Sequence, residues 1–248
     1  MEIVKDILAV NKQVLKKSIA SLRDNWIIIF TGMVYVIINI IALLLVFTIF
    51  TGLLSIFAGI AVAVLSASLI SNYFYLLFNV INYNRVTFQD FKDGFKYFLR
   101  KIYTVLFFAW IGTYFLGILQ GMLGFNALIL DLIIKLSVFI LLNALPETLY
   151  LKVLEPMDSI MYAVDFIREN IINWAIPNLI FYLLLYSITG KLIVDIFAIH
   201  INASLGLDGL VRYLLGQVVF SFIMIYRGHL YKLLSTSTRR KRMFMNKF

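Results

Sequence analysis

Six long runs of apolar residues divide this sequence, and they constrain its fold more than any other feature. The runs cover about residues 26–50, 53–81, 102–124, 126–145, 171–190 and 209–234. A helix of roughly 20 apolar residues is long enough to cross the hydrocarbon core of a bilayer. Because lipid offers the backbone no hydrogen-bond partners, each run is expected to be helical. The sequence therefore predicts an all-α transmembrane bundle with six crossings, arranged as three hairpins.

The composition excludes an ordinary soluble domain. Of the 248 residues, 62% are hydrophobic and only 14% are charged, whereas soluble domains are about 45–50% apolar and about 25% charged. A soluble fold of this composition would leave much apolar surface in water, so lipid must solvate most of the side chains. We predict a single integral membrane domain over residues 1–248, with no cleaved signal segment before the first run.

Basic residues are distributed unevenly among the segments that join the runs. Of the 22 Lys and Arg residues, 18 lie in the N-terminal segment, in the stretches 82–101 and 146–170, or near the C-terminal end. The exceptions are Lys191 and Arg212 in outer segments, and Lys135 and Arg227 within runs. Since Lys and Arg collect on the cytoplasmic side, we expect a cytoplasmic (inner) membrane location with both termini in the cytoplasm. This topology explains the net charge of +9 without nucleic-acid binding.

Three cytoplasmic stretches have the pattern of amphipathic surface helices, which lie in the headgroup plane. The clearest is 87–101, where Thr87 and Asp90 have the spacing of a capping box. Helical periodicity places four of its rings on one face: Phe88, Phe91, Phe95 and Phe98.

The other two predicted surface helices are residues 1–24 and a helix that begins at Pro156, a residue suited to a first turn. The apolar stripe of the first is Val4, Leu8, Leu15, Ile19 and Leu22. The stripe of the second is Met157, Ile160, Val164 and Ile167.

Ionisable residues in the outer half of the last three helices are the first candidates for a functional site. Asp131 and Lys135 are four residues apart in the fourth run, so they share a helix face and can pair. We expect both inside the bundle, because exposing a charge to acyl chains is costly. Two further pairs repeat this spacing, which gives the set Asp131, Lys135, Lys191, Asp195, Asp208 and Arg212. One interpretation is a polar cavity that opens outward; the alternative is one neutralised pair and four interfacial charges.

The C-terminal tail, residues 235–248, follows the last run almost directly. It contains four consecutive basic residues, Arg239, Arg240, Lys241 and Arg242. Beside a membrane, each such residue contributes on the order of 1 kcal/mol to the attraction of anionic lipids. We therefore predict that the tail contacts anionic lipids at the cytoplasmic face.

The sequence lacks the common signatures of catalysis and cofactor binding. It has no cysteine and only two histidines, His200 and His229, so thiolate or histidine metal sites are not expected. It also lacks a Gly-rich phosphate loop, an HExxH pair and a GxSxG elbow. We expect no catalytic, cofactor-binding or metal-binding residues, and a protein that is not an enzyme.

Two segments resemble parts of known bacterial membrane proteins. Residues 154–170, with Glu155-Pro156-Met157-Asp158 and Phe166-Ile167-Arg168-Glu169-Asn170, resemble the entry to a crossing in a loose group of six-helix proteins. The group includes the YciC-like proteins and the membrane domain fused to some glycerophosphoryl diester phosphodiesterases. The segment 88–99 resembles the surface helix after their second crossing. The resemblance implies six helices in a bacterial cytoplasmic membrane and no catalytic residue.

The chain is also similar to permease subunits of ABC-2 type exporters, which work with a separate ATPase. Those have an N-terminal amphipathic helix, a coupling helix after the second crossing and extra outer structure before the sixth. Here the corresponding places are 1–24, 87–101 and 191–208, whereas the inner stretch 146–170 is longer than such permeases usually have.

Three hypotheses follow from the sequence. The first is a non-enzymatic component for envelope or lipid handling or for transport. The second is an exporter permease with an ATPase partner. The third is a membrane interaction or immunity protein without transport. A homo-oligomer is compatible with each of them.

Overall fold

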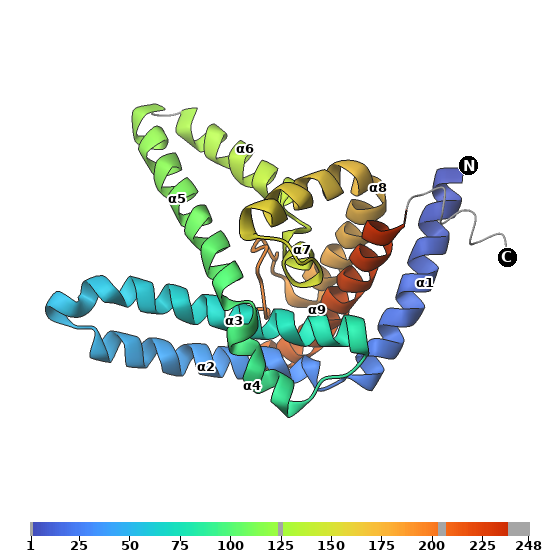
Figure 1. The fold of residues 1–248 in the computed structure, drawn as a ribbon, viewed down its shortest axis with the longest axis horizontal. Coiled ribbons are helices and arrows are strands. Elements are labelled where there is room, and N and C mark those ends of the chain that lie inside the picture. Colours follow the sequence, from blue (N-terminus) through green and yellow to red (C-terminus); the bar gives the residue numbers. More distant parts are fainter. Residues whose placement is uncertain (1, 124–125, 203–206, 238–248) are drawn as a thin grey trace.

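The computed structural model describes residues 2–123, 126–202 and 207–237 (Figure 1). Within these residues the chain is helical and has no strand. The elements are α1 (Glu2–Asp24), α2 (Ile28–Ile49), η1 (Gly52–Leu54), α3 (Ser55–Tyr83), α4 (Phe88–Tyr97), α5 (Leu99–Leu123), α6 (Asn126–Leu141), α7 (Leu145–Leu151), α8 (Pro156–Thr189) and α9 (Leu207–Thr236). Six helical stretches of the described chain are long and apolar enough to cross a membrane. The predicted all-α bundle with six crossings is confirmed, and the chain is a multi-pass membrane protein.

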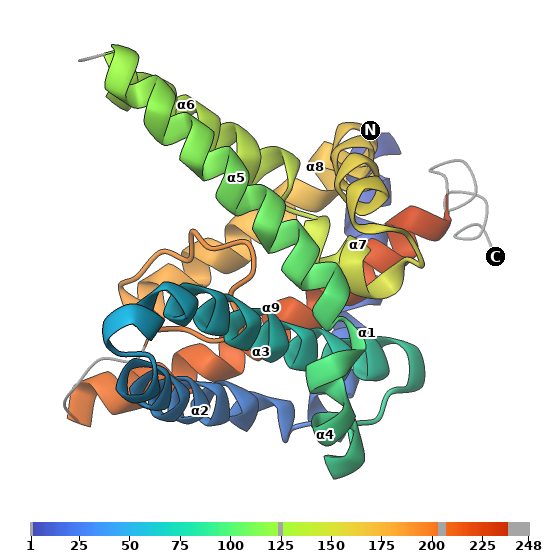
Figure 2. The same ribbon diagram turned by 60° about the vertical axis from the view of Figure 1, so that its left-hand side comes forward.

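Two helical hairpins extend from a shared core in different directions. One consists of α2 and α3 and the other of α5 and α6, and both views show them apart (Figures 1 and 2). The core contains α7, α8, α9 and the second half of α3, with α1 packed against α9. The start of α1 and the end of α9 lie at the side of the molecule away from the tips of both hairpins (Figure 2).

Side-chain hydrogen bonds define both ends of α4, and at its C-terminal end they come from α3. Thr87 and Asp90 form the predicted capping box, because the Thr87 hydroxyl accepts from the Asp90 N–H at 3.1 Å and the Asp90 carboxylate accepts from the Thr87 N–H at 2.7 Å. At the other end, the Ser71 hydroxyl donates to the Gly94 carbonyl at 2.7 Å and accepts from the Phe98 N–H at 2.8 Å. The hydroxyl thus replaces an intrahelical hydrogen bond, which interrupts helices. The predicted helix over 87–101 is therefore divided between α4 and α5.

The four phenylalanines between residues 88 and 98 do not share one environment. Phe91 stacks on Tyr35 of α2 at 6.3 Å between ring centroids, and Phe95 contacts Phe91 edge to face. Phe98 packs against aromatic rings of α3. Phe88 is 73% exposed, so it does not pack on protein as the other three rings do. It occupies the first helical position, before the turn that packs against α3.

Helix α1 confirms the predicted N-terminal helix but packs through a different face. The buried residues include Val10, Val14, Ser18 and Ser21, whereas Leu8 and Ile19 of the predicted stripe are 65% and 59% exposed. The packed face suits α9, because the Ser21 hydroxyl lies 3.0 Å from the His229 Nε2. Leu8 and Ile19 are thus free to contact lipid, whereas Leu15 and Leu22 of the stripe are partly buried against the core.

Helix α8 is continuous from Pro156 to Thr189, which corrects the prediction of a separate surface helix before the fifth crossing. The charged join at 168–170 contains no helix-breaking residue, so the helix runs through it. Ile167 is buried while Met157 is 57% exposed, so only the later part of the predicted apolar stripe packs inside.

Close packing at Gly228 of α9 gives a test of the fold. A Cβ at this position would lie 2.8 Å from both the Ile81 side chain and the Tyr150 hydroxyl. We expect Gly228→Val to destabilise the protein by about 1–3 kcal/mol through overpacking. Gly117→Val in α5 is the matched control, since a Cβ there meets open space. Thermal unfolding in detergent compares the two, and equal melting temperatures would contradict this packing.

Candidate functional site

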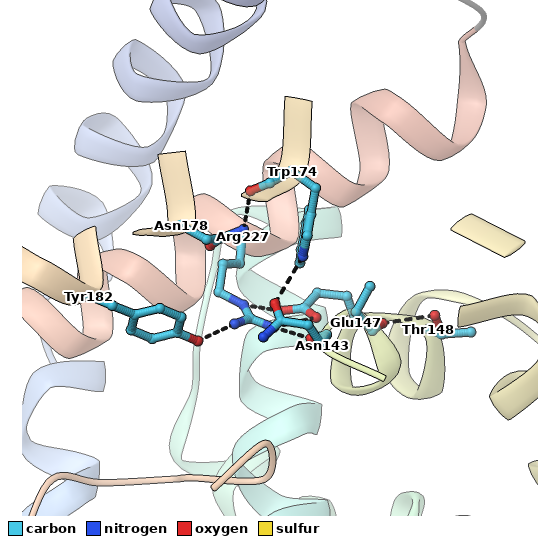
Figure 3. Close-up of polar contacts among 8 residues, drawn as sticks. Asn143, Glu147, Thr148, Trp174, Asn178, Tyr182 and Arg227 are labelled. Carbon is cyan, nitrogen blue, oxygen red and sulfur yellow. Dashed lines mark hydrogen bonds and ion pairs between the residues drawn. The ribbon is translucent and has the colours of Figure 1, made fainter. Parts of the chain in front are cut away.

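Arg227 of α9 and Glu147 of α7 form an ion pair in the core of the bundle (Figure 3). The Arg227 Nε lies 2.7 Å from Glu147 Oε1, and the Nη2 lies 3.0 Å from Oε2. The two side chains are 3% and 0% exposed. Two parallel hydrogen bonds of this kind are the strongest geometry that arginine and a carboxylate adopt.

Neighbouring groups bind further N–H groups of the guanidinium. The Arg227 Nη1 donates to the Tyr182 hydroxyl, and the Nη2 also donates to the Asn143 carbonyl. The Trp174 ring centre lies 5.2 Å from the guanidinium carbon, and its Nε1 donates to the Asn143 side chain at 2.9 Å. Figure 3 shows these groups converging from α7, α8, α9 and the short segment between α6 and α7. A buried ion pair needs such hydrogen bonds to offset its desolvation.

Arg227 lies within a predicted apolar run, but no partner for it was predicted. Glu147 lies in the stretch 146–170, which was expected to be a cytoplasmic connection. Pro146 occupies the first turn of α7, and this short helix turns Glu147 into the core. The only available signal was a basic residue within an apolar run, since such a residue normally has a partner.

Asp131 and Lys135 of α6 pair as predicted. The Lys135 Nζ lies 2.7 Å from Asp131 Oδ2, and Gln120 of α5 donates to Asp131 Oδ1 at 2.8 Å. Lys135 is nevertheless 72% exposed, so the expectation that both charges lie inside the bundle is wrong for the lysine. A long side chain can reach an interface while its stem contacts apolar surface. The pair lies on the α5–α6 hairpin and lines no pocket with the other four predicted residues.

A pocket of about 440 Å³ lies between α2, α3 and residues 190–202, which we call the return segment. Lys191 and Asp195 of the predicted cavity line it, together with His200. The helices contribute polar groups from Asn39 and Ser66. Asp208 and Arg212 do not line this pocket. The structure therefore brings two of the six predicted residues into one site.

The return segment packs back along the bundle. α8 ends at Thr189, where Gly190 adopts a left-handed conformation with φ of 66°. A Cβ on Gly216 of α9 would lie 2.6 Å from the Thr189 side chain. Since α9 begins at Leu207, α8 stops about two turns inside the end of α9.

Contacts of the return segment place it beside the middle of the α2–α3 hairpin. The Phe197 ring lies 6.2 Å from the Phe74 ring of α3. The pocket residues Asn39 and Ser66 are near the midpoints of α2 and α3. The stretch 191–208 was predicted as extra outer structure, and its described part packs against the bundle. The reason is that the segment buries its own apolar residues, such as Ile201, against the bundle.

A second hollow, of about 850 Å³, lies between α1, α8 and the end of α9. Its lining includes Asp6 and Asp165. These carboxylates already have protein partners, because Asn173 donates to Asp6 at 3.3 Å and Arg168 lies 3.5 Å from Asp165. The predicted lipid-binding residues Arg239, Arg240, Lys241 and Arg242 lie outside the described residues.

Comparisons with protein-family models, with curated proteins and with solved structures find no match to this chain. The two family resemblances of the sequence therefore stay proposals. Function has to be argued from the two polar sites that the fold creates, the buried Glu147–Arg227 pair and the pocket beside the return segment. The first is fully occupied by protein groups, whereas the second is open to a ligand.

Proposed function

We propose that this protein is a non-enzymatic component of a cytoplasmic membrane that handles lipids or transports a solute, and that its ligand binds in the pocket beside the return segment. One observation carries the proposal: the non-helical return segment, which contains Lys191 and Asp195, lies beside the middle of the candidate spans α2 and α3. Non-helical backbone is tolerated at membrane depth only where it is buried in protein or lines an aqueous cavity. Ionisable side chains at that depth mark substrate or ion pathways.

The end of α8 supports this function. α8 stops inside the bundle and continues as the return segment, so its last carbonyl groups lie near the pocket. Interrupted helices whose ends meet a ligand near the bilayer midplane are typical of secondary transporters. Asn39 and Ser66 add polar groups from α2 and α3, two spans that contain no charged residue. Together these features favour a site for a polar group within the membrane.

Water access to the pocket tests the proposal directly. The chain has no cysteine, so single-cysteine variants have no background. A hydrophilic thiol reagent needs the thiolate and therefore water. We expect Ser66→Cys, in the pocket, to react at least about tenfold faster than Val64→Cys, which lies on the same helix outside the pocket and is 41% exposed. Equal reaction rates in the membrane would rule out an aqueous pocket.

The basic-residue distribution supports an orientation with both termini in the cytoplasm, where the tail 235–248 would contact anionic lipids. We expect an impermeant thiol reagent added to intact cells to label Thr51→Cys at the tip of the α2–α3 hairpin. Arg85→Cys and Val153→Cys should react only after the cells are opened, and all three positions are exposed. The reverse pattern would show the opposite orientation.

An exporter permease with an ATPase partner is a second candidate, favoured by one feature of α4. This helix follows the second crossing, as the resemblance requires, and it presents Phe88 at 73% exposure with the Lys92 Nζ 4.7 Å from the ring centre. If a nucleotide-binding subunit co-purifies with the parent protein but not with Phe88→Asp, this candidate is favoured over the first.

A further inference from the structure

The pocket presents one cation and one anion that do not neutralise each other. Lys191 and Asp195 have the same four-residue spacing as Asp131 and Lys135, but no ion pair joins them among the described residues. Gly190 ends α8 in a left-handed conformation, so helical spacing no longer places the two charges on one face. Asp195 Oδ1 accepts from the Phe197 N–H at 2.9 Å, which orients the carboxylate. Both charges are exposed and available to a ligand.

The helices bring two neutral polar groups to the pocket, which Thr189, His200 and Asn202 also line. Asn39 and Ser66 line it, and neither side chain takes part in a hydrogen bond among the described residues. Polar side chains inside helical membrane proteins normally bond across helices, so groups without a protein partner at a pocket point to a ligand or to water. The lining thus offers a cation, a carboxylate, amides, hydroxyls and an imidazole, a set that suits a zwitterion with ester or hydroxyl oxygens.

The border of the pocket is apolar and open to the side. Leu192 and Val194 lie between the two charged residues of the return segment and are 66% and 70% exposed. In a chain embedded in a bilayer, such residues contact acyl chains. A ligand that satisfies both parts of the site therefore has a zwitterionic head and apolar chains. A pocket of about 440 Å³ lies within the range of about 300–1,000 Å³ that is usual for small ligands.

We propose that this pocket binds the head group of an amine-bearing phospholipid, phosphatidylethanolamine, which enters from the bilayer. This inference rests on the proposed function and specifies its ligand. The phosphate pairs with Lys191, and the primary ammonium donates to Asp195. Asn39 and Ser66 are placed to bond the remaining oxygens of the head group. A choline head cannot donate hydrogen bonds from its quaternary nitrogen, and a glycerol head has no cation for Asp195. The site therefore discriminates by hydrogen bonding as well as by charge.

The test is lipid binding by the delipidated protein in detergent, measured by native mass spectrometry with phosphatidylethanolamine, phosphatidylcholine and phosphatidylglycerol of identical chains. We expect the ethanolamine lipid to bind about tenfold more tightly than the other two, as one charge-assisted hydrogen bond predicts. Asp195→Asn should remove the preference for ethanolamine over choline, and Lys191→Gln should weaken both lipids alike. Asp208→Asn and Arg212→Gln are matched controls outside the pocket, with the parental preference.

Two results would overturn the lipid assignment. One is equal binding of the three lipids to the parent protein, and the other is an unchanged preference in Asp195→Asn. The same head-group chemistry could come from a phospholipid or from a soluble molecule, and free phosphoethanolamine distinguishes the two. If it displaces the lipid at a similar concentration, the ligand is a soluble zwitterion instead. Rapid labelling of Ser66→Cys without any lipid preference would leave the proposed function standing and refute only its ligand.

Discussion

Replacing Arg227 with methionine is expected to remove most of the folded protein. The change leaves the Glu147 carboxylate, which is 0% exposed, without its cation. Removing one partner of a buried pair costs about 3–5 kcal/mol, while whole domains are stable by only about 5–15 kcal/mol. Glu147→Gln should be damaging for the same reason, since it removes one charge and leaves the guanidinium uncompensated. The measurement is the folded yield and the melting temperature in detergent.

A double-mutant cycle separates the ion pair from the packing around it. We expect Arg227→Met with Glu147→Leu to cost less than the sum of the single changes, because no charge stays buried. Some cost should persist, since Tyr182 and Asn143 also lose their bonds to Arg227.

The matched control for this cycle is the exposed pair of Arg100 and Glu155, which are 3.8 Å apart and 89% and 74% exposed. Neutralising either of its members should change stability by about 0–1 kcal/mol. If Arg227→Met proved as stable as Arg100→Gln, the pair would not be buried as the structure has it.

The helices were predictable because each depends on residues close together in the sequence. Apolar runs of membrane length and the Thr87–Asp90 capping box are local patterns, and the structure confirms both. The join at 168–170 was predicted to separate two helices, yet its charged residues continue α8. Polarity alone does not end a helix; a residue such as Gly190, with its left-handed conformation, does.

The candidate sites were less predictable because they depend on contacts between distant segments. Glu147 and Arg227 are 80 residues apart, and nothing local indicates that α7 turns the carboxylate into the core. The spacing of Lys191 and Asp195 predicted an ionic pair, but that spacing has meaning only within a helix. Periodicity also left open which apolar face packs on protein and which on lipid. In α1 the buried face includes Val10, Val14, Ser18 and Ser21, while Leu8 and Ile19 of the predicted stripe are exposed.

The rings of α4 provide the second large effect. Phe91 packs on Tyr35, whose hydroxyl donates to Asn72 at 2.7 Å, and Asn72 in turn binds the backbone of α4. Phe91→Asp with Phe95→Asp would place two carboxylates against this interface and break the contact between α4 and the α2–α3 hairpin. Loss of partly buried rings together with the desolvation of two charges should cost about 3 kcal/mol or more. Thermal unfolding in detergent and protease sensitivity at the loop before α4 measure the loss.

Phe88→Asp is the control that makes this experiment decisive. It introduces the same charge into the same helix, but at a ring that is 73% exposed. An acidic residue in the first turn also interacts favourably with the helix dipole, so this variant should be as stable as the parent or slightly more stable. The difference between the double mutant and the control then reports the packing of α4 on α2 and α3 rather than added charge. Similar melting temperatures for all three proteins would mean that α4 is not fixed to the hairpin, and that Ser71 and Asn72 do not hold it there.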